Sequence, residues 1–251
     1  MIITTPLKYN DTLLEEVKEL GRYYNIPFLY REKISTKKLV EKYSEVLVVG
    51  KEKVQLNRKN GNFTYHPNFS QVRLKRILKG ESDPFLEATN LTVGEKFLDC
   101  TMGLASDSII ASVVTDDVTA LESTLGVYLV VTIGMSKYRY TLQELEHASK
   151  VIKTHHINAY NFLKKQQDDS YDVIYFDPMY EEDVNSEGIE GLKHYADNSE
   201  LTEAIIEEAK RVASKRVVLK AHFNSPLFKR FKFMQCVRKS TVSHYGVILT
   251  S

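Results

Sequence analysis

The chain has 251 residues, of which 43% are hydrophobic and 27% are charged, and its net charge is +1. This composition is typical of a globular protein, and no stretch approaches the roughly 18 apolar residues of a membrane span. The first residues lack the basic-then-apolar order of a signal peptide. The two cysteines, Cys100 and Cys236, form no CxxC pair. We therefore expect no disulfide framework, no metal site and a cytoplasmic location.

The first 90 residues do not alternate between strands and helices. Apolar spacing predicts a helix over 11–24, with Asp11 as its N-cap, and a helix over 36–43 that Ser35 caps. Residues 26–30 are expected to form a short strand. Two hairpins follow, one turning near Gly50 and one at Asn60–Gly61, which is a strong hairpin signal. These elements predict a small N-terminal α+β domain over residues 1–67.

A basic helix is expected over 68–79, inside a linker that spans 68–90. Residues 1–90 carry a net charge of +5 and the remainder −4, so the first third favours a polyanionic partner. The helix could contact the phosphates of a nucleic acid, although a solvated linker explains the same charges. Asp83-Pro84 interrupts helix and marks the expected boundary. The candidate phosphate-binding residues are Arg73, Lys75, Arg76 and Lys79.

From residue 91 the pattern changes to alternating strands and helices, which predicts a mostly parallel sheet covered on both faces. We expect strands at 96–100, 118–122, 151–155, 172–176, 216–221, 233–239 and 245–249. The helices between them are expected at 106–114, 124–137, 141–148, 159–166, 201–213 and 226–230. Seven strands with a hairpin-like last pair favour the Rossmann-like sheet of a class I methyltransferase over residues 91–251.

A strand, a tight turn and the start of a helix follow one another around DCTMGLASD at 99–107. This arrangement is where an α/β fold holds a nucleotide-like ligand, and Gly103 would let the backbone approach it closely. We interpret the stretch as a site for S-adenosylmethionine, to which Thr101 also belongs. Asp99 or Asp107 could face the amino group of the methionine moiety, although a helix cap alone would explain Asp107.

Further cofactor contacts are expected at the ends of the next two strands. Glu122 closes the second strand, where a carboxylate can accept hydrogen bonds from ribose hydroxyls. Asn158 and Ala159 follow the third strand, where they could meet the adenine edge. His155 and His156 lie beside them, and no second cluster of ligands supports a metal.

The second motif is Asp177-Pro178-Met179-Tyr180, after the strand at 172–176. An exocyclic amine of a base is a poor nucleophile, because its lone pair is delocalised into the ring. A carboxylate and a backbone carbonyl that accept its two N–H bonds would orient the amine and stabilise positive charge on it. Tyr180 could stack on an extruded base. The alternative is an ordinary strand-end turn, for which Asp and Pro are favourable residues.

These motifs resemble the RsmJ-type methyltransferases, which methylate N2 of a guanine in 16S ribosomal RNA. The family's DATAGLGRD is similar to residues 99–107, LER to 121–123, HASSL to 156–160, VVYLDPMF to 173–180 and TKRVVVKR to 214–221. Residues 47–61 also resemble the family's small domain. The resemblance implies cofactor contacts at Ser106, Asp107, Glu122, Ser123, Asn158, Ala159 and Asp177.

The sequence departs from the family at Ala105, where the family has glycine, and at Ser123, where it has arginine. Five acidic residues also lie between 181 and 190, where the family has lysines, and an acidic rim repels a phosphate backbone. We predict methylation of a guanine amine in small-subunit ribosomal RNA, with Asp177, Pro178 and Tyr180 as the catalytic residues. Met179 and Lys220 would line the substrate side. The alternatives are another amine substrate and a non-catalytic RNA- or ribosome-binding module.

Overall fold

The computed structural model describes residues 1–178, 201–238 and 241–250. These residues form two compact units. The first unit holds residues 1–66 and 124–139, and the second holds the other described residues. Across the described ranges, no helix is both long enough and apolar enough to cross a membrane.

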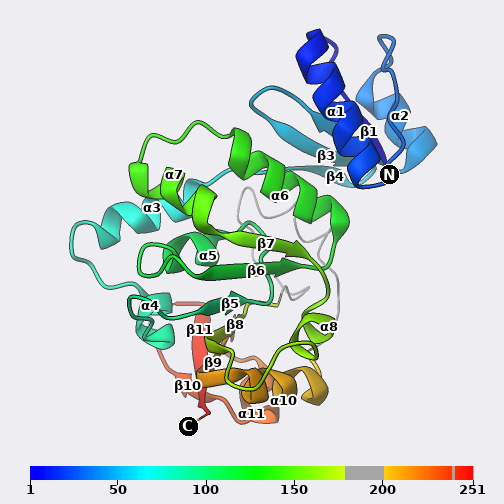
Figure 1. Ribbon diagram of the computed structural model, residues 1–251. Helices are drawn as coiled ribbons and strands as arrows, with labels where there is room; N and C mark the ends of the chain where they lie inside the picture. Colours follow the sequence, from blue (N-terminus) through cyan, green and yellow to red (C-terminus); the bar gives the residue numbers. More distant parts are fainter. Residues whose placement is uncertain (179–200, 239–240, 251) are drawn as a thin grey trace. The chain divides into compact units, whose positions relative to one another are not determined.

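The first unit is built on a four-stranded sheet in the order β1-β2-β3-β4 (Figure 1). Strand β1 is parallel to β2, and the other neighbours are antiparallel. Both predicted hairpins are confirmed, since β2 and β3 are joined by residues 50–53, and β3 and β4 turn at Asn60. The strands are β1 (Ile2–Thr4), β2 (Glu45–Val49), β3 (Val54–Arg58) and β4 (Gly61–Thr64).

Helices cover both faces of this small sheet. Leu39 of α2 (Thr36–Tyr43) packs with Val46 and Ile2 on one face. The opposite face meets α1 (Asp11–Tyr23) and α6 (Leu125–Lys137). Helix α6 comes very close, because a Cβ atom on Gly126 would lie 2.5 Å from the Leu56 side chain. A larger residue at Gly126 would therefore force the Leu56 side chain to shift.

Three details of this unit differ from the sequence-based expectations. Asn10, not Asp11, caps α1, and its side chain accepts a hydrogen bond from the Leu13 N–H. Residues 26–30 form no strand beyond a single bridge between Phe28 and Ile3. Strand β1 was not predicted, because three residues at the start of a chain offer too short a pattern to assign.

The second unit contains a seven-stranded sheet in the order β10-β11-β9-β8-β5-β6-β7 (Figure 1). The five strands from β9 to β7 are parallel, and β11 is antiparallel to both of its neighbours. The predicted α/β sheet is thus confirmed strand by strand. The strands are β5 (Phe97–Asp99), β6 (Val118–Glu122), β7 (Lys153–His156), β8 (Tyr171–Phe176), β9 (Ala213–His222), β10 (Met234–Cys236) and β11 (Ser243–Leu249).

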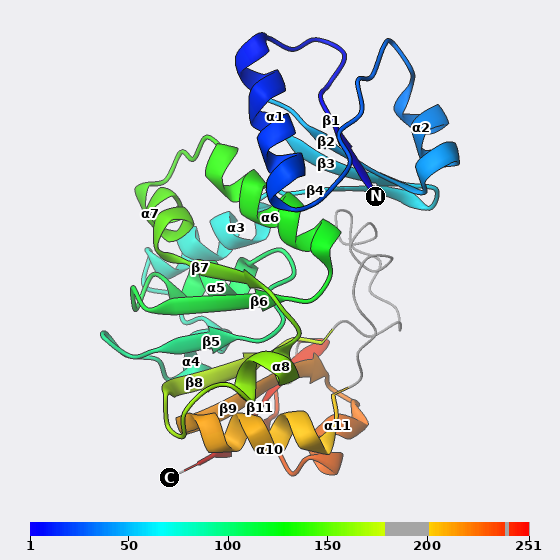
Figure 2. The same ribbon diagram turned by 45° about the vertical axis from the view of Figure 1, so that its right-hand side comes forward.

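The helices of this unit lie in two groups on the two faces of the sheet (Figure 2). One group holds α3 (Asn68–Ile77), α4 (Pro84–Thr89), α5 (Ser106–Ala111) and α7 (Gln143–Val151). The other holds α8 (Ala159–Leu163), α10 (Glu203–Val212) and α11 (Pro226–Arg230). Most ends differ by a few residues from the expected ranges. The largest change is at Val151, which ends α7 instead of opening β7.

Strand alternation decides which side chains face the helix α5. Leu98, Ile174 and Leu219 belong to the apolar core beside α10. Successive residues of a strand point to opposite faces, so the next residues along these strands project toward the α5 side. Those residues are Asp99, Tyr175 and Lys220. One face of the sheet is accordingly an ordinary apolar core, and the other carries polar groups near its carboxyl end.

Candidate active site

The predicted motifs meet at one edge of the second unit's sheet, where the parallel strands end (Figure 1). Strand β5 ends at Asp99, β6 at Glu122 and β8 just before Asp177. The loop after β7 is held to β6 by a hydrogen bond from the Ile157 N–H to the Glu122 carbonyl, at 3.0 Å. Ligands of open α/β sheets bind at this edge.

A threonine joins the two motifs. The Asp177 N–H donates a hydrogen bond to Thr101 Oγ1 at 2.7 Å, so the end of β8 is fastened to the turn after β5. Asp99 Oδ1 accepts from the Thr101 N–H at 2.9 Å, and Asp99 Oδ2 accepts from the Ser108 hydroxyl at 2.6 Å. Asp177, Thr101 and Asp99 are thus linked to one another and, through Ser108, to helix α5. The two motifs thus meet as the sequence predicts.

Asp99 is 1% exposed and has no cation as a direct partner among the contacts described above. Burial raises the pKa of Asp99 to about 7, although the Ser108 hydroxyl and the Thr101 N–H oppose the shift. A carboxyl group with this pKa exists in both protonation states near neutral pH. Asp99 is therefore much easier to protonate than an exposed aspartate.

The turn itself uses left-handed backbone at two positions. Gly103 has a φ of 48°, and its N–H donates to Glu122 Oε2 at 3.3 Å. Ala105 has a φ of 58° and immediately precedes α5. A side chain disfavours this conformation, which explains why glycine suits the corresponding place in the family that the sequence resembles. Alanine is tolerated here with some backbone strain.

Asp107 lies at the centre of a buried ion-pair network and does not cap α5. The N-cap position belongs to Ala105, which makes no side-chain cap. Asp107 Oδ1 lies 2.5 Å from an Arg73 nitrogen, and Oδ2 accepts from the Tyr175 hydroxyl at 2.8 Å. Burial acts to raise the pKa of Asp107, but the charges of Lys220 and Arg73 outweigh it and hold the pKa well below its usual value.

Arg73 reaches this network from α3. Its guanidinium also binds both oxygens of Asp83, at 2.9 and 2.8 Å, and lies over the ring of Phe85. Such forked pairing fixes both partners firmly. The predicted phosphate contact of Arg73 stays a prediction, and in this structure its guanidinium binds carboxylates.

Lys220 links Asp107 to Asp177. Its ammonium lies 2.6 Å from Asp177 Oδ2 and 3.4 Å from Asp107 Oδ2. Burial acts to lower the pKa of Lys220, but the two carboxylates outweigh it and raise the pKa above its usual value, so the ammonium stays charged. Removal from water raises the pKa of Asp177, and the Lys220 ammonium counteracts part of that rise.

The other predicted residues lie nearby with local partners. Ser106 Oγ is 3.1 Å from Ser70 Oγ, the Asn158 side chain caps α8, and the Ser123 carbonyl lies 3.0 Å from His156 Nε2. Ala159 is the first residue of α8. The exposed cations of this stretch are Lys75 and Arg76 of α3 and Lys79 just beyond its end, and Arg76 pairs with Glu81. Met179, Tyr180 and the acidic stretch 181–190 lie outside the described residues.

Two members of the network were not found from the sequence. Tyr175 sits inside an apolar strand, and only its alternation with Asp177 hints that both face α5. Asp83 was interpreted as a boundary marker, yet it caps α4 and binds Arg73. Ion pairs between residues far apart in the chain leave no local pattern in a sequence.

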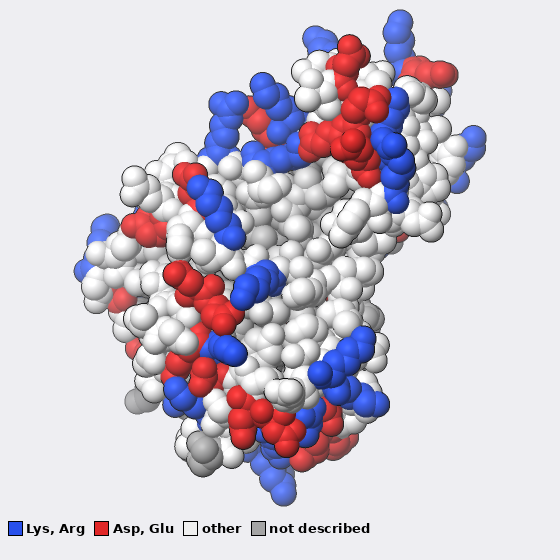
Figure 3. Space-filling model, viewed as in Figure 1, with Lys and Arg blue, Asp and Glu red and all other residues white. Residues whose placement is uncertain are grey.

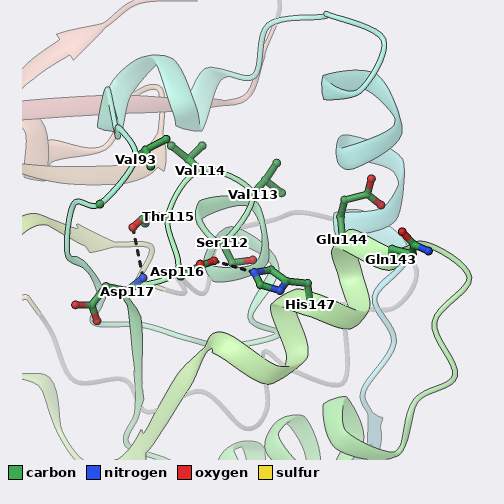
Figure 4. A pocket seen from close by; sticks show the side chains of 11 residues that line it. Val93, Ser112, Val113, Val114, Thr115, Asp116, Asp117, Gln143, Glu144 and His147 are labelled. Atoms are coloured by element: carbon green, nitrogen blue, oxygen red, sulfur yellow. Dashed lines mark hydrogen bonds and ion pairs between the residues drawn. The ribbon is translucent and has the colours of Figure 1, made fainter.

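A hollow of about 630 Å³ opens at the opposite, amino end of the sheet (Figure 4). Figure 4 shows His147 of α7 turned toward Asp116, and the two side chains lie 2.8 Å apart. None of the predicted site residues lines it. The residues that do are Val93, Gly94, Ser112, Val113, Val114, Thr115, Asp116, Asp117, Gln143, Glu144 and His147.

The carboxyl edge fits S-adenosylmethionine by the chemistry of its groups. Glu122 places a buried carboxylate at the end of β6, as a ribose diol requires, and Gly103 brings left-handed backbone without a side chain beside it. Within the residues that the structure describes, no group of three or more His, Cys, Asp and Glu side chains could hold a metal ion.

A sheet in this order, with its ligand turn after β5, defines a class I S-adenosylmethionine-dependent methyltransferase fold. A family profile described as "Putative SAM-dependent methyltransferase" matches residues 31–241. The chain belongs to this family, and its cofactor is S-adenosylmethionine.

The chain is also similar to individual proteins, one uncharacterised and one named as a methyltransferase. The Bacillus subtilis protein YpiP is 40% identical over 256 residues, covering the whole of both chains. A Psychrobacter cryohalolentis protein named ribosomal RNA small subunit methyltransferase J is 24% identical over 196 residues, covering 70% of this chain and 66% of the relative. The predicted resemblance to that enzyme family is thereby confirmed as a distant similarity.

Among solved structures, a SAM-dependent methyltransferase from Neisseria gonorrhoeae superposes with a TM-score of 0.65. The two chains are 17% identical, and the match covers 100% of this chain and 96% of the other. At this identity the likeness establishes the fold, which confirms the predicted class I sheet with a small additional N-terminal sheet.

Proposed function

We propose that this methyltransferase modifies an exocyclic amine, the guanine N2, in small-subunit ribosomal RNA. The observation that carries the proposal is the position of Asp177. Its carboxylate follows β8 at the carboxyl edge, its N–H is fixed by Thr101, and 31% of its side chain is exposed. A partly exposed carboxylate beside a cofactor turn is placed to bind a group that arrives from outside.

Asp177 and Pro178 would act on the amine together. The Asp177 carboxylate accepts one N–H bond and the Pro178 carbonyl accepts the other, which turns the nitrogen lone pair toward the methyl donor. Tyr180 would stack on the base. When bound, S-adenosylmethionine supplies a methyl group on a sulfonium. The residues expected to hold it are Asp99, Thr101, Gly103, Ser106, Asp107, Glu122, Ser123, Asn158 and Ala159.

The charges of the site favour a cationic reaction centre. Three carboxylates, of Asp83, Asp107 and Asp177, share two cations, Arg73 and Lys220. The network therefore carries one surplus negative charge. That surplus would stabilise positive charge on an amine as it gains a methyl group, because the site holds its groups away from bulk water.

Binding to RNA would use the exposed cations Lys75 and Arg76 of α3 and Lys79, which lies just beyond it. Figure 3 shows Lys and Arg interspersed with Asp and Glu on the face in view, without one continuous basic patch. Recognition would then depend on a few phosphate contacts and on the base held in the site. Such a substrate implies the cytoplasm as the location and the small ribosomal subunit, or its RNA, as the partner.

Nucleoside mass spectrometry of small-subunit RNA tests the proposal. We expect N2-methylguanosine to fall in cells that lack the protein, to return when the wild-type chain is expressed, and not to return with Asp177→Asn. Unchanged guanine N2 methylation in the deletion strain would refute the proposed substrate.

A second candidate is an amine in another RNA, a protein or a small molecule. The five acidic residues between 181 and 190 favour it, because they follow the catalytic motif directly and repel phosphates. The same deletion strain distinguishes the two candidates, since a cationic substrate would leave ribosomal guanine unchanged while another methylated product disappears.

A further inference from the structure

We propose that Lys220 is a positioning residue for Asp177, occupying Asp177 Oδ2 so that Oδ1 is the oxygen presented to the substrate amine. The inference rests on the proposed function and assigns a role to a side chain of β9. The same contact would fix the orientation of the Asp177 carboxylate at the end of β8.

The register of the sheet brings the two residues together. Phe176 of β8 pairs with Leu219 of β9, and the two strands are parallel, so their next residues are neighbours at the same edge. The Lys220 ammonium indeed lies 2.6 Å from Asp177 Oδ2. Within the described residues, Asp177 Oδ1 accepts no hydrogen bond. Among the contacts that the described residues make, Oδ2 is therefore held and Oδ1 is not.

Lys220 is itself held in place. Asp107 Oδ2 lies 3.4 Å from its ammonium on the other side, and Asp107 is fixed by Arg73 and by the Tyr175 hydroxyl. Lys220 keeps only 26% of its side chain exposed. A partly buried lysine whose ammonium is held by two carboxylates loses little further freedom when substrate binds, so the carboxylate that it directs is preorganised.

The arrangement has a consequence for the proton of the amine. The nitrogen forms a bond to the methyl carbon, the electron pair of the broken carbon–sulfur bond stays on sulfur, and one surplus N–H proton must leave. Asp177 Oδ1 can accept that proton directly or through water. The Lys220 ammonium opposes the rise that burial causes in the pKa of Asp177, and so favours the ionised carboxylate that accepts a proton.

Several charged or titratable groups surround Asp177. They are Lys220 of β9, Asp107 of α5, Arg73 of α3, Asp99 of β5, Tyr175 of β8 and Tyr245 of β11. Of these, Lys220 forms the direct contact with the carboxylate. Its removal would raise the pKa of Asp177, whereas the neighbouring carboxylates already act in that direction.

The chain supplies a matched control on the same strand. Lys215 of β9 also pairs with two carboxylates, those of Glu95 and Asp172, but at the amino end of the sheet. If Lys220 serves only to neutralise buried charge, Lys220→Met and Lys215→Met will differ in stability alone. If Lys220 positions Asp177, the rate of methyl transfer will depend on pH differently in the two variants.

The experiment measures wild type, Lys220→Met, Lys220→Arg and Lys215→Met for methyl transfer against pH and for S-adenosylmethionine binding by calorimetry. We expect Lys220→Met to lower kcat roughly 10- to 100-fold and to move the acid limb about one pH unit upward. Cofactor affinity should stay within about threefold, and Lys220→Arg should recover much of the rate. Lys215→Met should keep the wild-type profile.

A second readout does not depend on the substrate. The carboxyl ¹³C shift of Asp177, assigned with Asp177→Asn, is followed against pH in the free protein. A higher Asp177 pKa in Lys220→Met than in Lys215→Met supports the contact, and equal values overturn the proposal. If ribosomal RNA is not methylated at all, the proposed substrate fails, and this titration still decides the role of Lys220.

Discussion

Strands β8 and β9 carry the same pair of residues at both ends. Asp172 and Lys215 lie near their starts, and Asp177 and Lys220 lie five residues further along each strand. At the amino end, Asp172 accepts hydrogen bonds from the Lys96 N–H and the Ser214 hydroxyl, both at 2.9 Å. Both oxygens of Asp172 therefore have partners within the protein, and the pair holds the edge of the sheet.

At the carboxyl end the lysine is more buried, since 26% of the Lys220 side chain is exposed against 49% for Lys215. The carboxylate there is bound at Oδ2 alone among the described residues. A buried ion pair is seldom the most stable way to fill a site, so its retention beside a cofactor turn points to function. On our proposal, the amino-end pair has a structural role and the carboxyl-end pair has a chemical one.

Replacing Asp177 and Asp172 in turn tests the difference between the two ends most directly. Asp177→Asn should lower kcat by roughly 10²- to 10³-fold, because the amine loses its charged acceptor. Asp172→Asn should keep kcat within about threefold and reduce stability instead, by about 1 to 2 kcal/mol. Steady-state kinetics and urea unfolding measure both. Equal losses of kcat in the two variants would contradict the assignment.

The two buried glutamates extend the comparison to the cofactor. Glu122→Gln should weaken S-adenosylmethionine binding roughly 10- to 100-fold, the usual loss for hydrogen bonds to a charged acceptor. Glu95→Gln, which removes the partner of Lys215 at the amino end, should leave the affinity unchanged. Calorimetry measures the S-adenosylmethionine affinity of both variants. A normal affinity in Glu122→Gln would remove that residue from the cofactor site.

Asp99 at the carboxyl end of the sheet and Asp172 at the amino end should also have opposite effects on the pH dependence of the unfolding free energy. The pKa of Asp99 is raised to about 7, so this group destabilises the fold increasingly as pH rises from about 4 to 7. Asp99→Asn should therefore gain stability relative to wild type across this window, by up to about 1.4 kcal/mol per pH unit.

Asp172 is the control for that measurement. Its pKa is lowered, because the Lys96 N–H, Ser214 and Lys215 outweigh burial. Its contribution is present above about pH 4 and lost below, so Asp172→Asn should change relative to wild type only in acid. Urea unfolding at several pH values measures how the unfolding free energy of each variant changes with pH. A flat difference for Asp99→Asn from pH 5 to 7 would argue against the raised pKa.

The smallest effect concerns the backbone of the cofactor turn. Ala105→Gly should raise the unfolding free energy by about 0.5 to 1 kcal/mol, since glycine relieves the left-handed strain. Ala111→Gly, in the last turn of the same helix, should lower it by about 1 kcal/mol or more. Thermal unfolding measures the change in stability of both variants. A loss of stability in Ala105→Gly would mean that entropy outweighs strain.

The sequence predicted the seven strands of the large sheet because each has an apolar run bounded by turn residues. It also predicted that the turn at Gly103 and the carboxylate of Asp177 would meet, since carboxyl ends of parallel strands share an edge. It did not predict that Asp107 would bind Arg73, because contacts between distant residues depend on packing. Residues 26–30 were wrongly assigned as a strand from composition alone, since pairing decides a strand.

Arg73 and Asp83 come from helices that precede the large sheet, yet they complete the charge balance around Asp107. A shortened protein that starts at residue 91 would retain every strand of that sheet. It would leave Asp107 facing Lys220 without its guanidinium, and the aspartate would then compete with Asp177 for a single ammonium. A fragment that carries the catalytic sheet therefore needs α3 and α4 as well, so that Asp107 keeps its guanidinium partner.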